Sequence, residues 1–318
     1  MDMKMIRGGA FPTMVTPYNK AGDVDYGAVR AMTEWYWEKG CDGIFASCQS
    51  SEIHELSLAD RARLSREVLK TAEDLARGSG RPRMTVVASG HVSRDREEQE
   101  TELRAVAETG CDALILISNR MDAANLSEDA WLRDTEHLMN VLPEEIPLGV
   151  YECPRPYKRL LSDRMLSFCA QSGRFAFMKD TCCDAAVIAR RMKLLEGTPM
   201  LLLNANGQTL LDSLRAGAHG YCGVMCNFHP ELFVWLCHNY GKDPARADLV
   251  QSFLGCAAFL ESLAYPVIAK YHLKEIEGLP LESISARTRD ERECTDYHRT
   301  CIRQMDLLAR HIKELIKD

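Results

Sequence analysis

The sequence predicts an α/β fold, a (β/α)8 TIM barrel followed by an all-helical C-terminal extension. Eight short apolar or β-branched runs recur along the first 230 residues, amphipathic stretches separate them, and the strand pattern stops after Pro230. A doubly wound open sheet has the same alternation with fewer strands, and no Gly-x-Gly-x-x-Gly follows the first run. We therefore expect a barrel catalytic domain over residues 1–230 and a helical domain over 231–318.

The predicted strands are short and largely apolar. The runs MTVVAS at 84–89 and ALILI at 113–117 are typical of parallel strands that are covered on both faces. The eight strands are expected at 10–16, 43–47, 84–89, 113–117, 147–151, 175–179, 200–204 and 220–224.

The stretches between these strands carry helix start and stop signals. A capping box, SLAD, begins a helix at 57–60, and Ser127 and Ser162 each precede a helix in the N-cap position. A further helix over 94–109 is expected to end at Gly110, because glycine favours the backbone conformation that ends a helix.

The region after Pro230 is expected to be helical, with breaks at 241–244, at Pro266 and at 278–280. The last helix is predicted near 290–317, packed on the barrel or on a neighbouring subunit. Its expected buried stripe has spacings of three and four residues and consists of Cys301, Met305, Leu308, Ile312 and Ile316.

Composition excludes several classes of protein. The 318 residues include 39 basic and 46 acidic side chains, and the resulting net charge of −7 repels a nucleic-acid backbone. The 13 cysteines, with Cys182 next to Cys183, are too dilute for a disulfide scaffold and fit free thiols in a reducing cytosol. Charges within the first seven residues argue against a signal peptide, and the apolar window 249–269 is too polar to span a membrane. We expect a cytoplasmic protein with no nucleic-acid or membrane partner.

Lys179 is the first candidate catalytic residue, because it ends the sixth predicted strand and barrel enzymes place their catalytic groups at the C-terminal ends of strands. Strand alternation puts Phe175, Phe177 and Lys179 on one face. Such a lysine is partly desolvated, and desolvation favours the neutral amine that a Schiff base requires. The alternative is a lysine that extends into solvent at the strand end.

Two further groups belong to the same expected site. Tyr151 closes the fifth strand and could exchange protons with a carbinolamine and a substrate hydroxyl, or else simply cover the core. The run CQSSE at 48–52 follows the second strand, and its hydroxyl and amide groups suit a small carboxylate. Glu52 could instead cap local N–H groups.

Nine segments resemble the dihydrodipicolinate synthase / N-acetylneuraminate lyase family. The most informative are GAFPTMVTPY at 9–18, YECP at 151–154 and MKD at 178–180, and the resemblance covers about residues 8–280. The other segments match in the same order and lie at 40–43, 51–57, 110–113, 217–220, 227–230 and 266–270.

The resemblance implies a class I aldolase, a lyase that acts on pyruvate or a longer 2-oxo acid together with an aldehyde, in a homotetramer or homodimer. Lys179 would form a covalent imine with the keto carbon, without a separate cofactor or metal, and Tyr151 would handle the proton. Gln49 and Ser50 take the two carboxylate-binding positions of the family. Cys222 takes a position whose backbone lies close to the bound pyruvyl group.

The sequence departs from the family pattern in three places. Two family glycines in the loop 48–52 are replaced, and Gln49 stands where a hydroxyl residue is usual, which should narrow or shift the pocket. The family's paired tyrosines fall on Asn119 and Arg120, so the usual relay from a neighbouring subunit cannot form. The arginine that holds the synthase's second substrate aligns with Pro156. These changes favour a divergent 2-oxo acid aldolase or dehydratase of sugar-acid or sialic-acid catabolism.

Three residues near the expected site have alternative roles. Arg120 could anchor a distal carboxylate in bidentate fashion, or could pair with Asp122 or with a neighbouring subunit. Arg155 is a further candidate for that carboxylate. His91 follows the third strand and could face the pocket or lie in solvent.

Two rival functions remain open besides a 2-oxo-3-deoxy sugar acid dehydratase. Cys-x3-Cys at 222–226, with His219 and His229, and the pair at 182–183 suggest a zinc enzyme, although structural zinc normally needs two spaced pairs. A non-catalytic 2-oxo acid-binding paralogue is the other. The retention of both Lys179 and Tyr151 argues against it.

Overall fold

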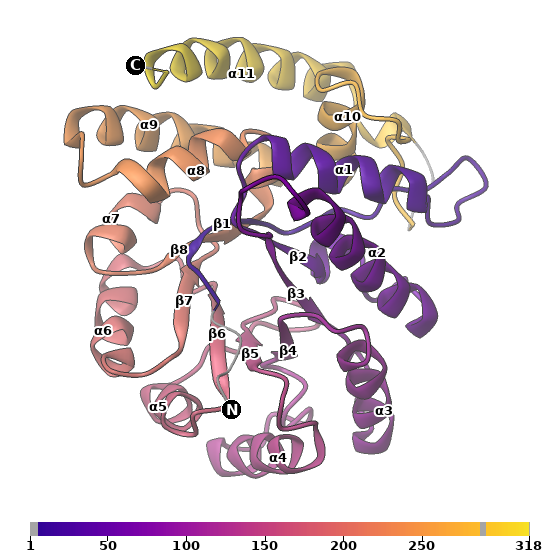
Figure 1. Cartoon of the computed structure of the whole chain (residues 1–318), viewed down its shortest axis with the longest axis vertical. Coiled ribbons are helices and arrows are strands. Elements are labelled where there is room, and N and C mark those ends of the chain that lie inside the picture. Colours follow the sequence, from indigo (N-terminus) through magenta and orange to yellow (C-terminus); the bar gives the residue numbers. More distant parts are fainter. Residues whose placement is uncertain (1–5, 287–290, 318) are drawn as a thin grey trace.

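Eight parallel strands form a nearly closed barrel in the computed structural model, which describes residues 6–286 and 291–317 (Figure 1). Each strand pairs with the next in chain order and β8 pairs with β1, whereas β1 meets β2 through a single bridge from Thr13 to Phe45. All eight predicted strands are confirmed, each within a few residues of its expected bounds. They are β1 (Gly9–Pro12), β2 (Gly43–Ser47), β3 (Thr85–Ser89), β4 (Ala113–Ile117), β5 (Leu148–Tyr151), β6 (Phe175–Asp180), β7 (Leu201–Asn204) and β8 (Gly220–Gly223).

Helices alternate with the strands and surround the barrel (Figure 1). The hydroxyls of Ser57, Ser127 and Ser162 each accept a hydrogen bond from the first turn of their helix, so all three predicted N-caps are confirmed. The third helix is shorter than expected and ends at Ala107, before the left-handed Gly110 (φ +82°). The surrounding helices are α1 (Tyr26–Glu38), α2 (Leu58–Ala76), α3 (Arg96–Ala107), α4 (Glu128–Val141), α5 (Asp163–Gln171), α6 (Ala185–Leu195), α7 (Leu210–Arg215) and α8 (Pro230–Asn239).

A β-bulge in β6 corrects one sequence prediction. Leu148 on β5 lies opposite Phe175 and the next residue lies opposite Phe177, so Ala176 is an extra residue on β6. Phe177 therefore points into the barrel, together with Ala176, while Phe175 packs outside it against the helices. The prediction that Phe175 shares the face of Lys179 was wrong, because a bulge reverses the alternation of side chains on one side of it.

The described part of the C-terminal region is helical, as predicted, and comprises α9 (Pro244–Ala257), α10 (Val267–Glu275) and α11 (Asp296–Leu315). The last helix begins at Asp296, later than the expected 290, which lies outside the described residues. Its buried face is Ile302, Asp306, Ala309 and Ile312, and Leu308 is 51% exposed. Of the predicted stripe, Ile312 is buried, and Cys301, Met305 and Ile316 pack partly buried against the core, so only Leu308 departs from the prediction.

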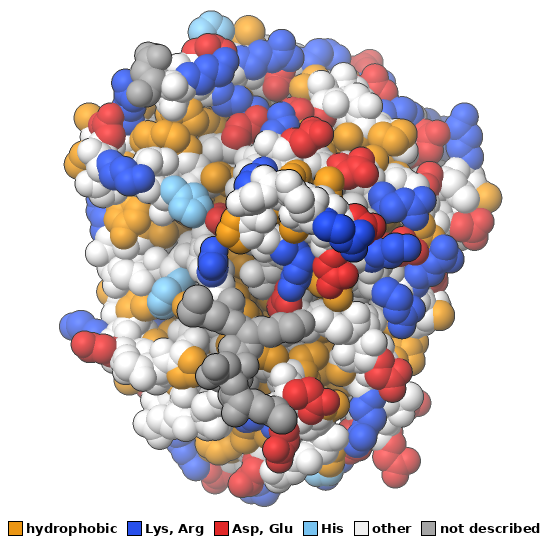
Figure 2. Space-filling model, viewed as in Figure 1, with side chains coloured by type: hydrophobic (Ala, Val, Ile, Leu, Met, Phe, Trp, Pro, Cys, Tyr) orange, Lys and Arg blue, Asp and Glu red, His pale blue; other side chains and the backbone are white. Residues whose placement is uncertain are grey.

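The helix α8 packs against β1 and β8, so the last helix of the barrel lies after residue 230, on the C-terminal side of the predicted division between domains. Acidic and basic side chains are mixed over the face that Figure 2 shows. Among the described residues no single helix is long and apolar enough to cross a membrane; only a pair bent by 118°, 244–262 with 267–275, passes on length and composition.

Candidate active site

A cavity of about 440 Å³ lies at the C-terminal ends of the strands. The loops after β2, β5, β6, β7 and β8 contribute to its wall, together with residues of the C-terminal region. Its lining consists of Gln49, Ser50, Glu52, His54, Glu55, Tyr151, Pro154, Arg155, Lys158, Lys179, Thr181, Cys183, Ala205, Asn206, Gly223, Val224, Glu261, Tyr265 and Pro266. This is the end of a barrel at which catalytic groups gather.

Lys179 and Tyr151 stand side by side at the floor of this cavity. They are direct partners in the pairing of β5 with β6, and the Lys179 Nζ lies 4.4 Å from the centre of the Tyr151 ring and 5.8 Å from that of Phe45. Phe45 in turn packs edge-on against Tyr151. Adjacent parallel strands that end at the same level bring the amine and the phenol together.

The amine of Lys179 has no hydrogen bond or ion pair within the described residues, although the side chain is only 4% exposed. The prediction of a solvent-extended lysine is therefore wrong for this chain. Burial, with the nearby Cys153, raises the pKa of Tyr151 well above its usual value, so the phenol keeps its proton at neutral pH. An amine with no partner among the described residues and a phenol that keeps its proton thus face one cavity.

The loop after β2 presents the two expected carboxylate-binding residues to the same cavity. The Cys153 thiol donates to Oε1 of Gln49 at 3.1 Å, which leaves the NH2 group of Gln49 to donate to a ligand. The Ser50 hydroxyl lies 3.0 Å from that of Thr13, to which it donates. Gln49 and Ser50 therefore line the cavity as the sequence predicted.

A buried ion pair connects this loop to the C-terminal region. Nζ of Lys270 donates to Oε2 of Glu52 at 2.9 Å and to the Ile284 carbonyl at 2.7 Å, and both charged side chains are buried. The other carboxylate oxygen of Glu52 accepts from the Ala286 N–H. Among the described residues, the Glu52 carboxylate therefore accepts from groups distant in the sequence rather than from the local N–H groups considered above.

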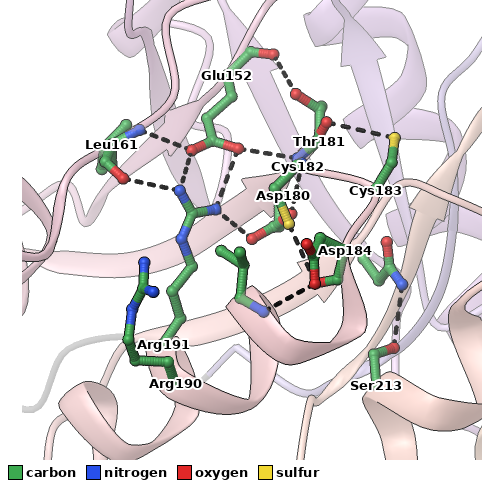
Figure 3. Close-up of polar contacts among 12 residues, drawn as sticks. Glu152, Leu161, Asp180, Thr181, Cys182, Cys183, Asp184, Arg190, Arg191 and Ser213 are labelled. Atoms are coloured by element: carbon green, nitrogen blue, oxygen red, sulfur yellow. Dashed lines mark hydrogen bonds and ion pairs between the residues drawn. The ribbon is translucent and has the colours of Figure 1, made fainter.

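A buried ionic network around Arg191, which the sequence analysis missed, joins Glu152 and Asp180 (Figure 3). Each catalytic candidate is followed by a carboxylate, Glu152 or Asp180, and the Arg191 guanidinium from α6 pairs with both. Arg191 Nη2 lies 2.7 Å from Glu152 Oε1, which also accepts from the Leu161 N–H. The network joins the ends of β5 and β6, so it positions the amine and the phenol.

A sequence signal existed for two of the three charged residues in that network. Glu152 and Asp180 are charged residues directly after apolar strands, and charges at such positions are rarely buried without a partner. Arg191 carries no such signal, because it lies in an ordinary amphipathic helix.

Arg120 and Cys222 do not line the main cavity. Cys222 lies in the barrel interior, where burial raises its thiol pKa to about 12, and the next residue, Gly223, reaches the wall. Arg120 is 7% exposed and lines a separate cavity of about 200 Å³, although its charge helps burial to lower the pKa of His54 on the main cavity wall. Asp122 pairs with Arg159 rather than with Arg120, so that prediction was wrong.

The other departures from the family pattern have structural roles. The Asn119 side-chain nitrogen lies within 2.8 Å of the carbonyls of Cys153, Arg155 and Tyr157, and so holds the loop after β5. His91 neither faces the cavity nor lies in solvent: it is buried, and its Nε2 accepts from the Ile117 N–H at 2.6 Å. Arg155 is exposed at the cavity wall.

Glu261 and Tyr265 enter the cavity from the C-terminal region, and the sequence analysis did not select either. Glu261 interrupts the apolar window 249–269, and this was the only available signal. Partial removal from water raises the pKa of its carboxyl, against the opposing charge of Lys179. A carboxyl group that can hold a proton therefore faces the same space as the amine.

The residues suggested for zinc do not come together in the described part of the chain. Cys222 is inside the barrel, Nδ1 of His219 accepts from the Leu202 N–H, and His229 packs against Phe253. The only group of three described His, Cys, Asp or Glu side chains with ligand atoms within 4.8 Å of one another lies elsewhere, in the C-terminal region.

Comparisons with known proteins agree with this geometry. The family model described as the Dihydrodipicolinate synthetase family matches residues 7–277. The chain is 23% identical to a 4-hydroxy-tetrahydrodipicolinate synthase of Methanothrix thermoacetophila, over 90% of this chain and 93% of the relative. It is 26% identical to one of Anaeromyxobacter dehalogenans, over 89% and 95%.

Solved structures share the fold. The chloride-inhibited dihydrodipicolinate synthase of Acinetobacter baumannii complexed with pyruvate superposes with a TM-score of 0.81 at 20% identity, covering 95% of this chain and 98% of that one. The sialic acid aldolase of Ruminococcus gnavus superposes with a TM-score of 0.79 at 20% identity, covering 97% and 99%.

Proposed function

The chain belongs to the dihydrodipicolinate synthetase family, and from this premise we propose that it is a Schiff-base-forming lyase for pyruvate or a longer 2-oxo acid. The observation that carries the proposal is the buried Lys179 amine, which lacks a partner among the described residues and lies beside the Tyr151 phenol in an open cavity. Family relatives named as synthases, and a structure bound to pyruvate, support the substrate class.

The chemistry follows from these two groups. The neutral amine adds to the keto carbon, and the carbinolamine takes up a proton at its hydroxyl and loses water to give a protonated imine. The imine accepts the electron pair of the bond between C3 and C4, so that an aldehyde leaves as the C4 hydroxyl loses its proton. The enamine is then protonated at C3, and water releases pyruvate and the free amine. Tyr151 is the proposed carrier of these protons, because its pKa keeps it protonated between steps.

Substrate orientation is proposed to depend on the loop after β2. Gln49 and Ser50 would donate to the 2-oxo acid carboxylate, and the chain at 222–223 would approach the pyruvyl group. Both loop residues line the cavity together with Lys179, which supports this arrangement.

The test is reductive trapping. Incubation with pyruvate and borohydride should add one reduced pyruvyl group, mapped to Lys179, and Lys179→Ala should lose labelling and turnover. Lys158→Met is the matched control, because Lys158 lines the same cavity and its loss should leave the labelling in place. Tyr151→Phe should keep much of the labelling but lose most turnover. Turnover by Lys179→Ala at the wild-type rate would exclude the mechanism, and labelling without any turnover would indicate a non-catalytic paralogue.

A longer, acidic second substrate is proposed from Arg120. Its guanidinium lies outside the lining of the main cavity, but its charge acts on His54 in that lining, and it has no ion-pair partner among the described residues. An unpaired buried charge is costly unless a ligand supplies the counter-charge, and a substrate longer than pyruvate would have to extend past His54 to supply it. Arg120→Met should raise the KM for 2-oxo-3-deoxy sugar acids or sialic acid far more than the KM for pyruvate exchange. An equal change for both substrates would contradict this role. A panel of these acids, scored for pyruvate release, would identify the substrate.

A sugar-acid dehydratase is the second candidate, and Glu261 favours it. Dehydration needs an acid that protonates the departing hydroxyl, and the carboxyl of Glu261 lines the cavity with a raised pKa. A Glu261→Gln variant that lost water elimination but kept the pyruvate adduct would support dehydration. Pyruvate release from every active substrate would contradict it.

We also propose a cytoplasmic homotetramer or homodimer. All 13 cysteines are free, as expected in a reducing compartment. Exposed apolar side chains line a groove between α11 and the segment 256–263, and a second subunit could cover it. Sedimentation of the purified chain tests the assembly, and a monomer at micromolar concentration would contradict it. The groove includes Phe259, Tyr297 and Leu308.

A further inference from the structure

A cluster of potential metal ligands lies at the junction of α10 and α11, outside the catalytic cavity. His272 belongs to α10, Glu277 lies two residues after that helix, and Asp306 belongs to α11. One ligand atom of each side chain lies within 4.8 Å of those of the other two. Three different positions along the chain thus direct nitrogen and oxygen donors at one point.

The His272 imidazole indicates that this point requires a ligand. The side chain is 1% exposed, and neither ring nitrogen has a hydrogen-bond partner among the described residues. Buried polar atoms are nearly always paired with protein, water or an ion. An imidazole nitrogen without a hydrogen-bond partner can offer its lone pair to an ion at this point.

The two carboxylates are already oriented by neighbouring side chains. Oε2 of Glu277 accepts from Nε1 of Trp35 at 2.9 Å and lies 3.1 Å from Nζ of Lys39, and these contacts leave Oε1 unused. Oδ2 of Asp306 pairs with Arg310 at 2.6 Å. Such outer contacts hold ligands in place in metal sites.

The neighbouring ring of His229 completes the wall. It is buried, its centre lies 5.7 Å from that of His272 at a steep angle, and both of its nitrogens also lack partners among the described residues. The aromatic ring of Phe228 packs 5.3 Å from His272. Aromatic rings therefore border the cluster on one side, and its two carboxylates complete it.

We propose that His272, Glu277 and Asp306 bind one divalent transition-metal ion of the Zn²⁺ class, with water as a fourth ligand, and that the ion ties α11 to α10. One imidazole with two carboxylates suits Zn²⁺, whereas Mg²⁺ and Ca²⁺ prefer oxygen ligands alone. Tetrahedral bonds of about 2.1 Å place ligand atoms about 3.4 Å apart, so small side-chain rotations would close the site. The role is structural, because the cluster is separate from Lys179 and its cavity.

The experiment uses the full chain, stripped with a chelator and titrated with Zn²⁺ against a chromophoric competitor. The wild type should bind one tight Zn²⁺ per chain. His272→Gln should weaken this binding by about 100-fold or more, since even changes around the first ligands cost about 10–100-fold. Asp306→Asn, which preserves shape, tests the same point should His272→Gln fold poorly. His311→Gln is the matched control, because this ring on α11 is exposed, and it should bind Zn²⁺ like the wild type.

Two further readouts separate this site from adventitious binding. Zn²⁺ should raise the melting temperature of the wild type and of His311→Gln but not of the two ligand variants, because an ion that binds only the folded chain stabilises it. Co²⁺ substituted for Zn²⁺ should lack the intense near-ultraviolet absorption of a thiolate complex. Zn²⁺ affinity that was equal in all variants, or a thiolate band from exposed residues such as Cys183 or Cys256, would overturn the proposal.

Discussion

Replacement of Arg191 by methionine tests the account of how the C-terminal ends of β5 and β6 are held. Arg191 is 2% exposed and its partners Glu152 and Asp180 are fully buried, so Arg191→Met leaves two carboxylates without a counter-charge. Removal of one member of a buried ionic group costs about 3–5 kcal/mol. We expect the free energy of unfolding to fall by that amount.

The loss of unfolding free energy in Arg191→Met should also depend on pH. Burial already raises the pKa of Glu152, with Asp180 acting in the same direction and Arg191 opposing both. Without Arg191, the folded chain holds a proton on this pair to a higher pH than the unfolded chain does. Stability is then lost as the pH rises above about 4.3, the unfolded pKa of glutamate, so the deficit should be smaller at pH 5 than at pH 8.

Urea unfolding followed by tryptophan fluorescence measures this change. If the dependence of the unfolding free energy on urea concentration is the same in both proteins, the substitution has changed stability alone. Arg190→Met is the matched control, because Arg190 precedes Arg191 and makes an exposed pair with Asp163 at 3.1 Å. Exposed pairs contribute about 0–1 kcal/mol. If Arg191→Met lost no more than Arg190→Met, the network would not be the support described here.

Three further outcomes are expected. Burial lowers the pKa of His91 to about 4, so the unfolded chain takes up a proton first as the pH falls below 6.5. His91 should therefore account for up to about 3 kcal/mol of the stability that is lost by pH 4. Urea unfolding should show that the stability of His91→Gln depends less on pH than that of the wild type, and an equal pH dependence would contradict this. Lys270→Met leaves the Glu52 carboxylate buried with one N–H donor, so the free energy of unfolding should fall by about 3–5 kcal/mol. Labelling by pyruvate should also become slower. Labelling at the wild-type rate would mean that the loop after β2 does not depend on the ion pair of Lys270 with Glu52. A Cβ at Gly43 would lie 2.1 Å from the Phe11 ring, so calorimetry of Gly43→Ala should report a loss of about 1–3 kcal/mol, and no loss would mean that the barrel interior can relax there.

Much of the fold is readable from local patterns. The period of the apolar residues and the serine N-caps act within a few residues of chain, so they predicted the strands and helix starts correctly. Lys179 and Tyr151 were found because both end strands, and parallel strands in a barrel bring their ends together whatever the intervening sequence is.

Tertiary structure alone decided which distant groups meet. The bulge that turns Phe175 outward arises from the pairing of two strands, and the choice of Arg159 over Arg120 as the partner of Asp122 depends on the path of a loop 37 residues away. Glu261 reaches the Lys179 cavity for the same reason. Contacts of this kind depend on side-chain geometry across the whole barrel, and the spacing of apolar residues along the sequence carries no information about it.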